Sequence, residues 1–280
     1  MNSNLQDRVD QCRATLRLFK SVVVAFSAGV DSTFLLALSV ETLGAENVLA
    51  VMGISPSLAR RERQAGRNLA QQIGAELVEI ETGELTDPNY SANTPERCFY
   101  CKSDLFRRLK NLAAKRGFRA VVSGANADDA GDFRPGMKAA KELGGFSPLM
   151  EAGLTKNDIR DASRAMRLPT WNKPAMACLA SRVPYGRKVT EEVLARVESA
   201  EDVLKALGFA QCRIRDHYPV ARIEVPTDEI LAAVELRRQI VEGLKSVGYT
   251  YVSLDLEGFR SGSMNDVLPA GITRSDDVSS

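Results

Sequence analysis

The chain lacks any apolar run approaching the roughly 18 residues that a membrane-spanning helix needs. Its first seven residues, Met1-Asn2-Ser3-Asn4-Leu5-Gln6-Asp7, also lack the basic and apolar regions of a secretory signal. We therefore expect a soluble cytoplasmic protein with no membrane partner.

An excess of charge of one sign is missing as well. The 280 residues include 37 Lys and Arg against 36 Asp and Glu, which gives a formal net charge of +1. Such a balance exerts no overall pull on nucleic acid, so a small-molecule substrate is favoured. At 44% hydrophobic and 26% charged residues, the chain is long enough for one large core or two domains.

Cysteines are few, and their number, five, is odd, which argues against a disulfide framework in a cytoplasmic protein. Cys12 falls on the apolar face of a helix expected near residues 5–19 and is assigned to the core. Cys98 and Cys101 form a C-x-x-C directly before a helix expected over 102–115, and Cys178 follows much later. Basic neighbours favour the reactive thiolate at these positions: Arg97, Lys102 and Arg182.

Cys98, Cys101 and Cys178 are candidate metal ligands. Three thiolates on an iron-sulfur cluster leave one iron open to an external ligand, whereas structural zinc takes four protein ligands. A Cys3His zinc site with His217, the single histidine, stays open. For the C-x-x-C pair alone, a redox disulfide or two buried thiols are further possibilities.

The G-x-x-x-x-G-K-[ST] pattern of the Walker loop is also absent. In its place, an apolar run from Val22 to Phe26 stops in Ser27-Ala28-Gly29-Val30-Asp31-Ser32, which opens an apolar-periodic stretch to Leu43. The run predicts a buried parallel strand, and the free amides of the helix that follows favour an anion. The sequence therefore predicts an ATP phosphate loop, with a ligand-free strand-turn-helix as the alternative.

Strands and helices alternate along the first half, which predicts an α/β fold with a doubly wound parallel sheet. Expected strands lie near 22–26, 48–54, 77–80 and 120–122, with helices near 58–73 and 102–115. Ser27 and Ser123 would then share the carboxyl edge of the sheet, where such folds bind ligands.

A capping box at Thr155-Lys156-Asn157-Asp158 predicts a helix over 159–166. Farther on, a smaller C-terminal α+β domain is expected from helices at 191–207 and 228–247 and strands at 212–216, 221–225 and 250–254. We divide the chain into an ATP-binding domain (1–170), an active-site connecting segment (171–188), a substrate or oligomerisation domain (189–260) and a disordered tail (261–280).

The S-[GA]-G-x-D-S pattern at 27–32 resembles the pyrophosphate (PP) loop of the adenine nucleotide alpha hydrolase-like superfamily. Further motifs resemble the LarE family: S-G-A-N-A-D-D (123–129), D-F-R-P-G (132–136), S-P-L-M-E (147–151), K-P-A-M-A-C-L-A-S-R (173–182), R-I-R (213–215) and A-R-I-E (221–224). Members are ATP-dependent sulfurtransferases of nickel-pincer nucleotide biosynthesis, related in their ATP domain to NAD synthetase and GMP synthetase. The resemblance covers most of the chain.

The resemblance implies a reaction on pyridinium-3,5-biscarboxylic acid mononucleotide. ATP adenylates a carboxylate, pyrophosphate leaves, and a sulfur nucleophile attacks the mixed anhydride. Asp31, Asp128 and Asp129 are candidates near Mg2+, although an Asx turn is equally open for the last two. The residues expected to bind ATP are Ser27, Ala28, Gly29, Val30, Asp31, Ser32, Gly124, Asp128 and Asp129.

By the same resemblance, Cys178 donates sulfur or anchors the donor. Members without the C-x-x-C pair sacrifice this cysteine and leave dehydroalanine, whereas members with all three cysteines are expected to carry a 4Fe-4S cluster with a transferable sulfide. We favour the cluster route, which needs a sulfide or other sulfur source. We also expect a homo-oligomer.

Substrate contacts are expected from basic side chains. Arg213 and Arg215 alternate on a strand and face one side, where they would clamp the substrate phosphate. Arg134, Lys173 and Arg182 are candidates for its carboxylates, and Phe99 or Tyr100 for stacking on the pyridinium ring. Each of these residues has an ordinary alternative as surface charge or core aromatic.

Two other functions remain open. One is an RNA-modifying thiolase of the same superfamily, against which the neutral charge argues. The other is a non-catalytic nucleotide-binding regulator, because a fold alone does not fix a function.

Overall fold

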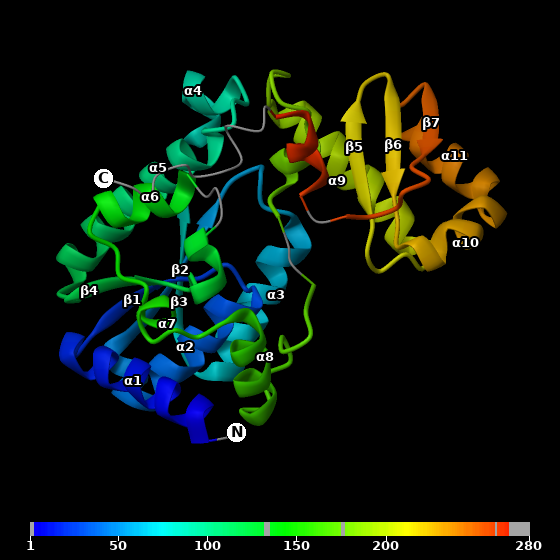
Figure 1. The fold of residues 1–280 in the computed structure, drawn as a ribbon. Helices are drawn as coiled ribbons and strands as arrows, with labels where there is room; N and C mark the ends of the chain where they lie inside the picture. The colour runs from blue at the N-terminus through cyan, green and yellow to red at the C-terminus, as the bar shows by residue number, and fades with distance from the viewer. Residues whose placement is uncertain (1–2, 132–134, 175–176, 261, 269–280) are drawn as a thin grey trace, which may run out of the picture. The chain divides into compact units, whose positions relative to one another are not determined.

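The computed structural model describes residues 3–131, 135–174, 177–260 and 262–268 (Figure 1). The chain forms two compact units. The first comprises residues 1–84, 98–176 and 271–280, and the second comprises residues 85–97 and 177–270. Each unit has its own sheet.

The sheet of the first unit is parallel, with strand order β3-β2-β1-β4. Its strands are β1 (Val22–Ala25), β2 (Val48–Ile54), β3 (Glu76–Glu81) and β4 (Ala120–Ser123). The central strand β1 pairs Val22 with Val48 on one side and with Ala120 on the other. The predicted α/β fold is confirmed.

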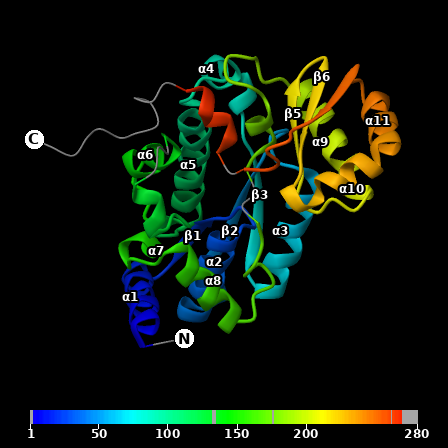
Figure 2. The ribbon, with the colours of Figure 1, turned by 45° about the vertical axis from the view of Figure 1, so that its right-hand side comes forward.

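Helices cover both faces of this sheet (Figures 1 and 2). Val22 and Val24 of β1 share one core cluster with Leu35 of α2, whereas Val23 between them packs with Phe106 of α5. Alternate residues of a strand point to opposite faces, so the unbroken valine run is what burial between two helical layers requires.

The helices of this unit are α1 (Ser3–Phe19), α2 (Val30–Leu43), α3 (Arg60–Ile73), α5 (Arg97–Arg116, from its second residue), α6 (Pro135–Glu142), α7 (Pro148–Glu151) and α8 (Lys156–Ala165). Short 3-10 turns lie at Ala45–Asn47 (η1) and Ala127–Gly131 (η3), and η2 (Glu84–Thr86) lies where the units meet in sequence.

Helix α1 confirms the predicted apolar face. Leu5, Val9, Cys12 and Leu16 are buried along it. Burial raises the pKa of the Cys12 thiol to about 12, with a smaller contribution from Glu151. Cys12 is therefore a core residue, as expected.

The second unit carries the sheet β5-β6-β7. Strand β5 (Arg213–His217) runs antiparallel to β6 (Val220–Glu224), which pairs in parallel with β7 (Tyr251–Leu254). The remaining elements of this unit are α4 (Pro88–Ser91), η4 (Leu179–Arg182), α9 (Glu191–Ala206), η5 (Thr227–Glu229), α10 (Ile230–Glu235), α11 (Arg237–Ser246) and η6 (Ser263–Val267).

Three local expectations are corrected by the structure. The C-x-x-C pair lies within the first five residues of α5, not before the helix. The single helix expected over 228–247 is divided into α10 and α11. Leu236, with a non-helical ψ of 12°, ends α10, and its carbonyl accepts the amide of Ile240 in the first turn of α11. Residues 263–267, expected to be part of a disordered tail, form η6, where the Ser263 hydroxyl accepts from Arg215 and donates to Glu224. Of the remaining tail, 261 and 269–280 lie outside the described residues.

Among the described residues, no helix is both long and apolar enough to cross a membrane.

Candidate active site

The loop between β1 and α2 is folded back on itself by two serines. The Ser32 hydroxyl accepts the Ser27 amide at 3.2 Å and lies 3.1 Å from the Ser27 hydroxyl. Ala28, with a φ of 56°, makes the left-handed turn, and Gly29 caps α2. The first amides of α2 therefore converge on a preformed anion-binding turn.

The end of β4 packs directly against this turn. A Cβ on Gly124 would lie 2.8 Å from the Ser32 amide nitrogen and 3.0 Å from the Asp31 carbonyl carbon. The sheet register pairs Ala25 with Ser123, so the residues after both strands emerge at one edge, as the sequence predicts. Only glycine allows so close an approach of the two backbones.

Replacing Gly124 tests this contact. In Gly124→Ala the methyl group must displace backbone at the start of α2, so we expect ATP affinity to fall by about ten-fold or more, with a stability loss of about 1–3 kcal/mol. Isothermal titration of ATP and urea unfolding measure the two effects. Unchanged ATP affinity would show that the turn does not bind the nucleotide.

The loop from Asn126 to Asp129 forms an Asx turn. The Asn126 side-chain oxygen accepts the Asp128 amide at 3.0 Å, and Asp129 accepts the Asn126 amide at 2.9 Å. Asp128 accepts the main-chain amide of Lys156 at 2.8 Å, which joins this loop to the start of α8. The Asx turn is thus made by Asn126 and not by either aspartate, and Asp129 is buried. The role of both aspartates near magnesium stays a prediction.

Asp31, among the described residues of this loop, is a candidate ligand for a cation. Its Oδ2 lies 2.5 Å from Lys156 Nζ. Its Oδ1 is buried and makes no hydrogen bond within the described part of the chain. Mg2+ binds through one or two carboxylates plus phosphate oxygens and waters, so it needs no larger protein cage. An unsatisfied oxygen beside an anion-binding turn therefore fits Mg2+ bound together with ATP.

Lys173 supports the same loop. Its Nζ donates to the Ala28 carbonyl at 3.0 Å and pairs with Glu62 at 2.6 Å. The contact with Ala28 stabilises the left-handed turn, and a role toward substrate carboxylates stays a prediction. Arg134, the other candidate from the first unit, lies outside the described residues.

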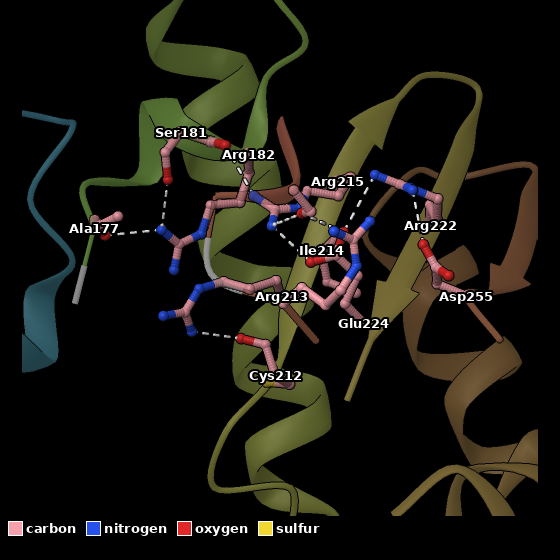
Figure 3. A network of polar contacts seen from close by, with 12 residues as sticks. Ala177, Ser181, Arg182, Cys212, Arg213, Ile214, Arg215, Arg222, Glu224 and Asp255 are labelled. Atoms are coloured by element: carbon pink, nitrogen blue, oxygen red, sulfur yellow. Dashed lines mark hydrogen bonds and ion pairs between the residues drawn. The ribbon is translucent and has the colours of Figure 1, made fainter. Parts of the chain in front are cut away.

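In the second unit, Arg182 holds the backbone around Cys178. Its side chain is 1% exposed, and its Nε pairs with Glu201 at 2.8 Å. The same guanidinium donates to the carbonyls of Ala177 and Cys178 at 2.8 and 3.0 Å (Figure 3). The Arg182 side chain is thus occupied within the protein, and in this geometry it orients the Cys178 backbone.

Asn93 and Arg97 hold the other side of this segment. The Asn93 amide nitrogen donates to the carbonyls of Val183 and Pro184 at 3.2 and 2.8 Å, and its oxygen accepts from Arg97. Arg97 also donates to the Ala180 carbonyl at 3.0 Å. The stretch after Cys178 is therefore bound to the residue that precedes Cys98 in the chain. Sequence reasoning missed this role of Asn93, because its partners are distant in the chain and its left-handed φ of 58° is visible only in the structure.

Arg213 and Arg215 lie on the same side of β5, since they are two residues apart on one strand (Figure 3). Arg215 donates to the Ser181 carbonyl at 3.0 Å and pairs with Glu224 at 2.6 Å. Burial, and then the nearby charge of Arg182, lower the pKa of Arg213 to about 10. Buried glutamates neutralise two guanidiniums of this group, Arg182 through Glu201 and Arg215 through Glu224. Binding of the substrate phosphate by Arg213 and Arg215 stays a prediction.

All five cysteines lie in the described part of the chain, and all are thiols. Cys12 and Cys212 are buried, Cys98 and Cys178 are exposed, and Cys101 is half-buried. Exposure of Cys98 rules out a pair of buried thiols. Because Cys98 and Cys101 are three residues apart near the N-terminus of α5, they share a helix face at the end that favours thiolates.

The donor chemistry of these three thiols fits an iron-sulfur cluster. Cys98 and Cys101 belong to the first unit and Cys178 to the second. The ranges that the structure describes contain no preformed group of three or more His, Cys, Asp or Glu side chains suited to a metal. Cluster binding therefore stays a proposal. Phe99 and Tyr100, the stacking candidates, contact each other edge to face with ring centroids 5.7 Å apart.

Known proteins resemble this chain in both of its units. Residues 3–123 match the family model described as NAD synthase. Over 255 residues the chain is 39% identical to the pyridinium-3,5-bisthiocarboxylic acid mononucleotide synthase of Lactiplantibacillus plantarum, covering 91% of this chain and 92% of that protein. An uncharacterised protein of Synechocystis is 41% identical over 266 residues, covering 94% and 99% of the two chains. An uncharacterised protein of Methanocaldococcus jannaschii is 27% identical over 242 residues, covering 86% and 92%.

The NAD synthase match ends at Ser123, so it spans all four strands of the parallel sheet and the loop at Ser27. The match to the synthase is long enough to include Cys178 as well. The chain therefore belongs to the LarE family and is an ATP-dependent sulfurtransferase.

Proposed function

We propose that this protein transfers sulfur to pyridinium-3,5-biscarboxylic acid mononucleotide at the expense of ATP, in biosynthesis of the nickel-pincer nucleotide cofactor. The supporting observation is the 39% identity, over 91% of the chain, to a synthase named for the corresponding bisthiocarboxylic acid mononucleotide. The matched region is long enough to span both the anion-binding turn at Ser27 and the segment around Cys178. One relationship thus accounts for a nucleotide loop and an exposed thiol in the same protein.

In the first step, the turn and the N-terminus of α2 bind the phosphates of ATP through main-chain amides. Asp31 would hold Mg2+, which spreads the charge that develops on the phosphates. A substrate carboxylate oxygen attacks the α-phosphorus, the bond to the β-phosphate oxygen breaks, and pyrophosphate leaves. The carboxylate, a poor electrophile, becomes an acyl adenylate with a good leaving group.

In the second step, a sulfur nucleophile adds to the acyl carbon, and AMP leaves with the electrons of the C–O bond. We propose that Cys98, Cys101 and Cys178 hold a 4Fe-4S cluster, which would supply a replaceable sulfide from an external sulfur source. Arg182 fixes the Cys178 backbone, and Arg213 with Arg215 would bind the substrate phosphate. Sacrifice of the Cys178 sulfur itself is the alternative route.

Anaerobic iron and sulfide analysis, combined with intact mass before and after turnover, tests both routes. We expect broad visible absorption, iron and sulfide in the purified protein, and pyrophosphate and thiocarboxylate only when ATP and the pyridinium dicarboxylate are both added. Cys98→Ala is expected to remove the iron and the absorption, because the cluster would lose one of three ligands.

Two outcomes would contradict the proposal. Colourless anaerobic protein that makes thiocarboxylate and loses mass at Cys178 would establish the sacrificial route. Absence of both pyrophosphate and thiocarboxylate would reject this substrate altogether.

A further inference from the structure

Lys156 connects α8 to the nucleotide loop. It is the first residue of α8, and its Nζ lies 2.5 Å from Asp31 Oδ2, although 125 residues separate the two in sequence. Neither side chain is fully buried, since Lys156 is 31% exposed and Asp31 21%. The ion pair is therefore open to competition from a bound ion.

The backbone of Lys156 is fixed by its neighbours. Its amide donates to Asp128, and the capping box of Thr155 and Asp158 closes the first turn of α8. Arg8 pairs with Asp158 at 2.6 Å and ties the same turn to α1. The flexible part is thus the side chain alone, a four-carbon stem carrying a compact charge.

Asp31 can interact with the Lys156 ammonium or with a bound metal ion. Its position in the first turn of α2 already favours negative charge, and one of its oxygens has no hydrogen bond within the described ranges. A divalent cation on this carboxylate would repel the Lys156 ammonium, because like charges a few ångströms apart destabilise each other. A metal ion on Asp31 therefore weakens the Lys156 ion pair, and the ion pair in turn weakens metal binding.

We propose that Lys156 is a positioning residue that neutralises the Asp31 carboxylate in the nucleotide-free enzyme. When ATP binds with Mg2+, the metal ion replaces the Lys156 ammonium at Asp31, and the ammonium then interacts with the polyphosphate. This inference rests on the proposed use of Mg2+ and ATP. Lys173, the other lysine at the loop, is unsuited to this exchange because the Ala28 carbonyl and Glu62 already hold its ammonium. Among the described residues, the acidic partner of Lys156 is Asp31, the group that the metal would take.

Lys156→Met is expected to move two affinities in opposite directions. Without nucleotide, Mn2+ titrated by electron paramagnetic resonance should bind about two- to five-fold tighter, since a partly exposed ion pair no longer competes. With metal removed by EDTA, ATP titrated by calorimetry should bind about ten-fold more weakly, because the Asp31 carboxylate would face the phosphates with no cation to neutralise it. A merely structural lysine would weaken both.

Three control variants sharpen the experiment. Lys138→Met, on the exposed face of α6, should leave both affinities unchanged. Lys156→Arg should retain the affinity for metal-free ATP, and Asp31→Asn should abolish the tighter Mn2+ binding when combined with Lys156→Met.

The inference is overturned if both affinities fall together in Lys156→Met or if neither changes. In those cases wild-type protein that still binds Mg-ATP and forms thiocarboxylate leaves the proposed function standing. Wild-type protein that binds no nucleotide would reject both this inference and the proposed function.

Discussion

Cys178→Ser is expected to abolish thiocarboxylate formation, by at least about a thousand-fold, while pyrophosphate release with ATP and substrate persists. Serine preserves the size of the side chain but neither donates sulfur nor binds iron as a thiolate does. The contacts that shape the nucleotide loop, from Ser32, Gly124 and Lys173, all come from the first unit and do not involve Cys178. Adenylation and sulfur transfer should therefore separate in this variant.

The measurement combines an enzyme-coupled pyrophosphate assay with mass spectrometry of the nucleotide product. Cys12→Ala is the matched control, because Cys12 is buried in α1 and should affect stability alone. Thiocarboxylate at wild-type yield from Cys178→Ser would exclude Cys178 as donor and as essential ligand. Loss of pyrophosphate as well would assign Cys178 to the folding or nucleotide step.

Much of the first unit follows from local pattern. The valines of β1 and the abrupt change to small residues at Ser27 specify a strand buried on both faces and a tight turn before a helix. The capping box at Thr155 marks the start of α8, although the helix begins at Lys156 and not at residue 159, since the capping box itself is helical from Lys156 on.

The partners of the charged residues could not be predicted in this way. Arg182 lies four residues after Cys178 in the sequence, which suggests a substrate contact. In the structure its side chain is buried and forms an ion pair with Glu201 of α9. Lys156 belongs to no phosphate motif and reaches Asp31 only because β4 and α8 close on the loop. Such pairings arise from tertiary structure, about which periodicity and propensity contain no information.

Arg182→Met is expected to lower the free energy of unfolding by up to about 3–5 kcal/mol, because the buried Glu201 would lose its guanidinium partner and keep the more exposed Lys205. Urea unfolding of the full chain, followed by circular dichroism, measures the loss. Arg116→Met removes an exposed ion pair with Glu76 and should cost no more than about 1 kcal/mol. An equally small loss in Arg182→Met would show that the buried pair contributes little.

The double variant Arg182→Met/Glu201→Leu separates stability from positioning. Replacing both buried charges by apolar groups should restore most of the lost stability, since no carboxylate is then left buried without the guanidinium that compensated it. Sulfur transfer should stay low, because the carbonyls of Ala177 and Cys178 still lack their common donor. Recovery of both stability and sulfur transfer would mean that Arg182 serves the fold alone, whereas stable protein with intact pyrophosphate release and little thiocarboxylate would identify it as the residue that orients Cys178.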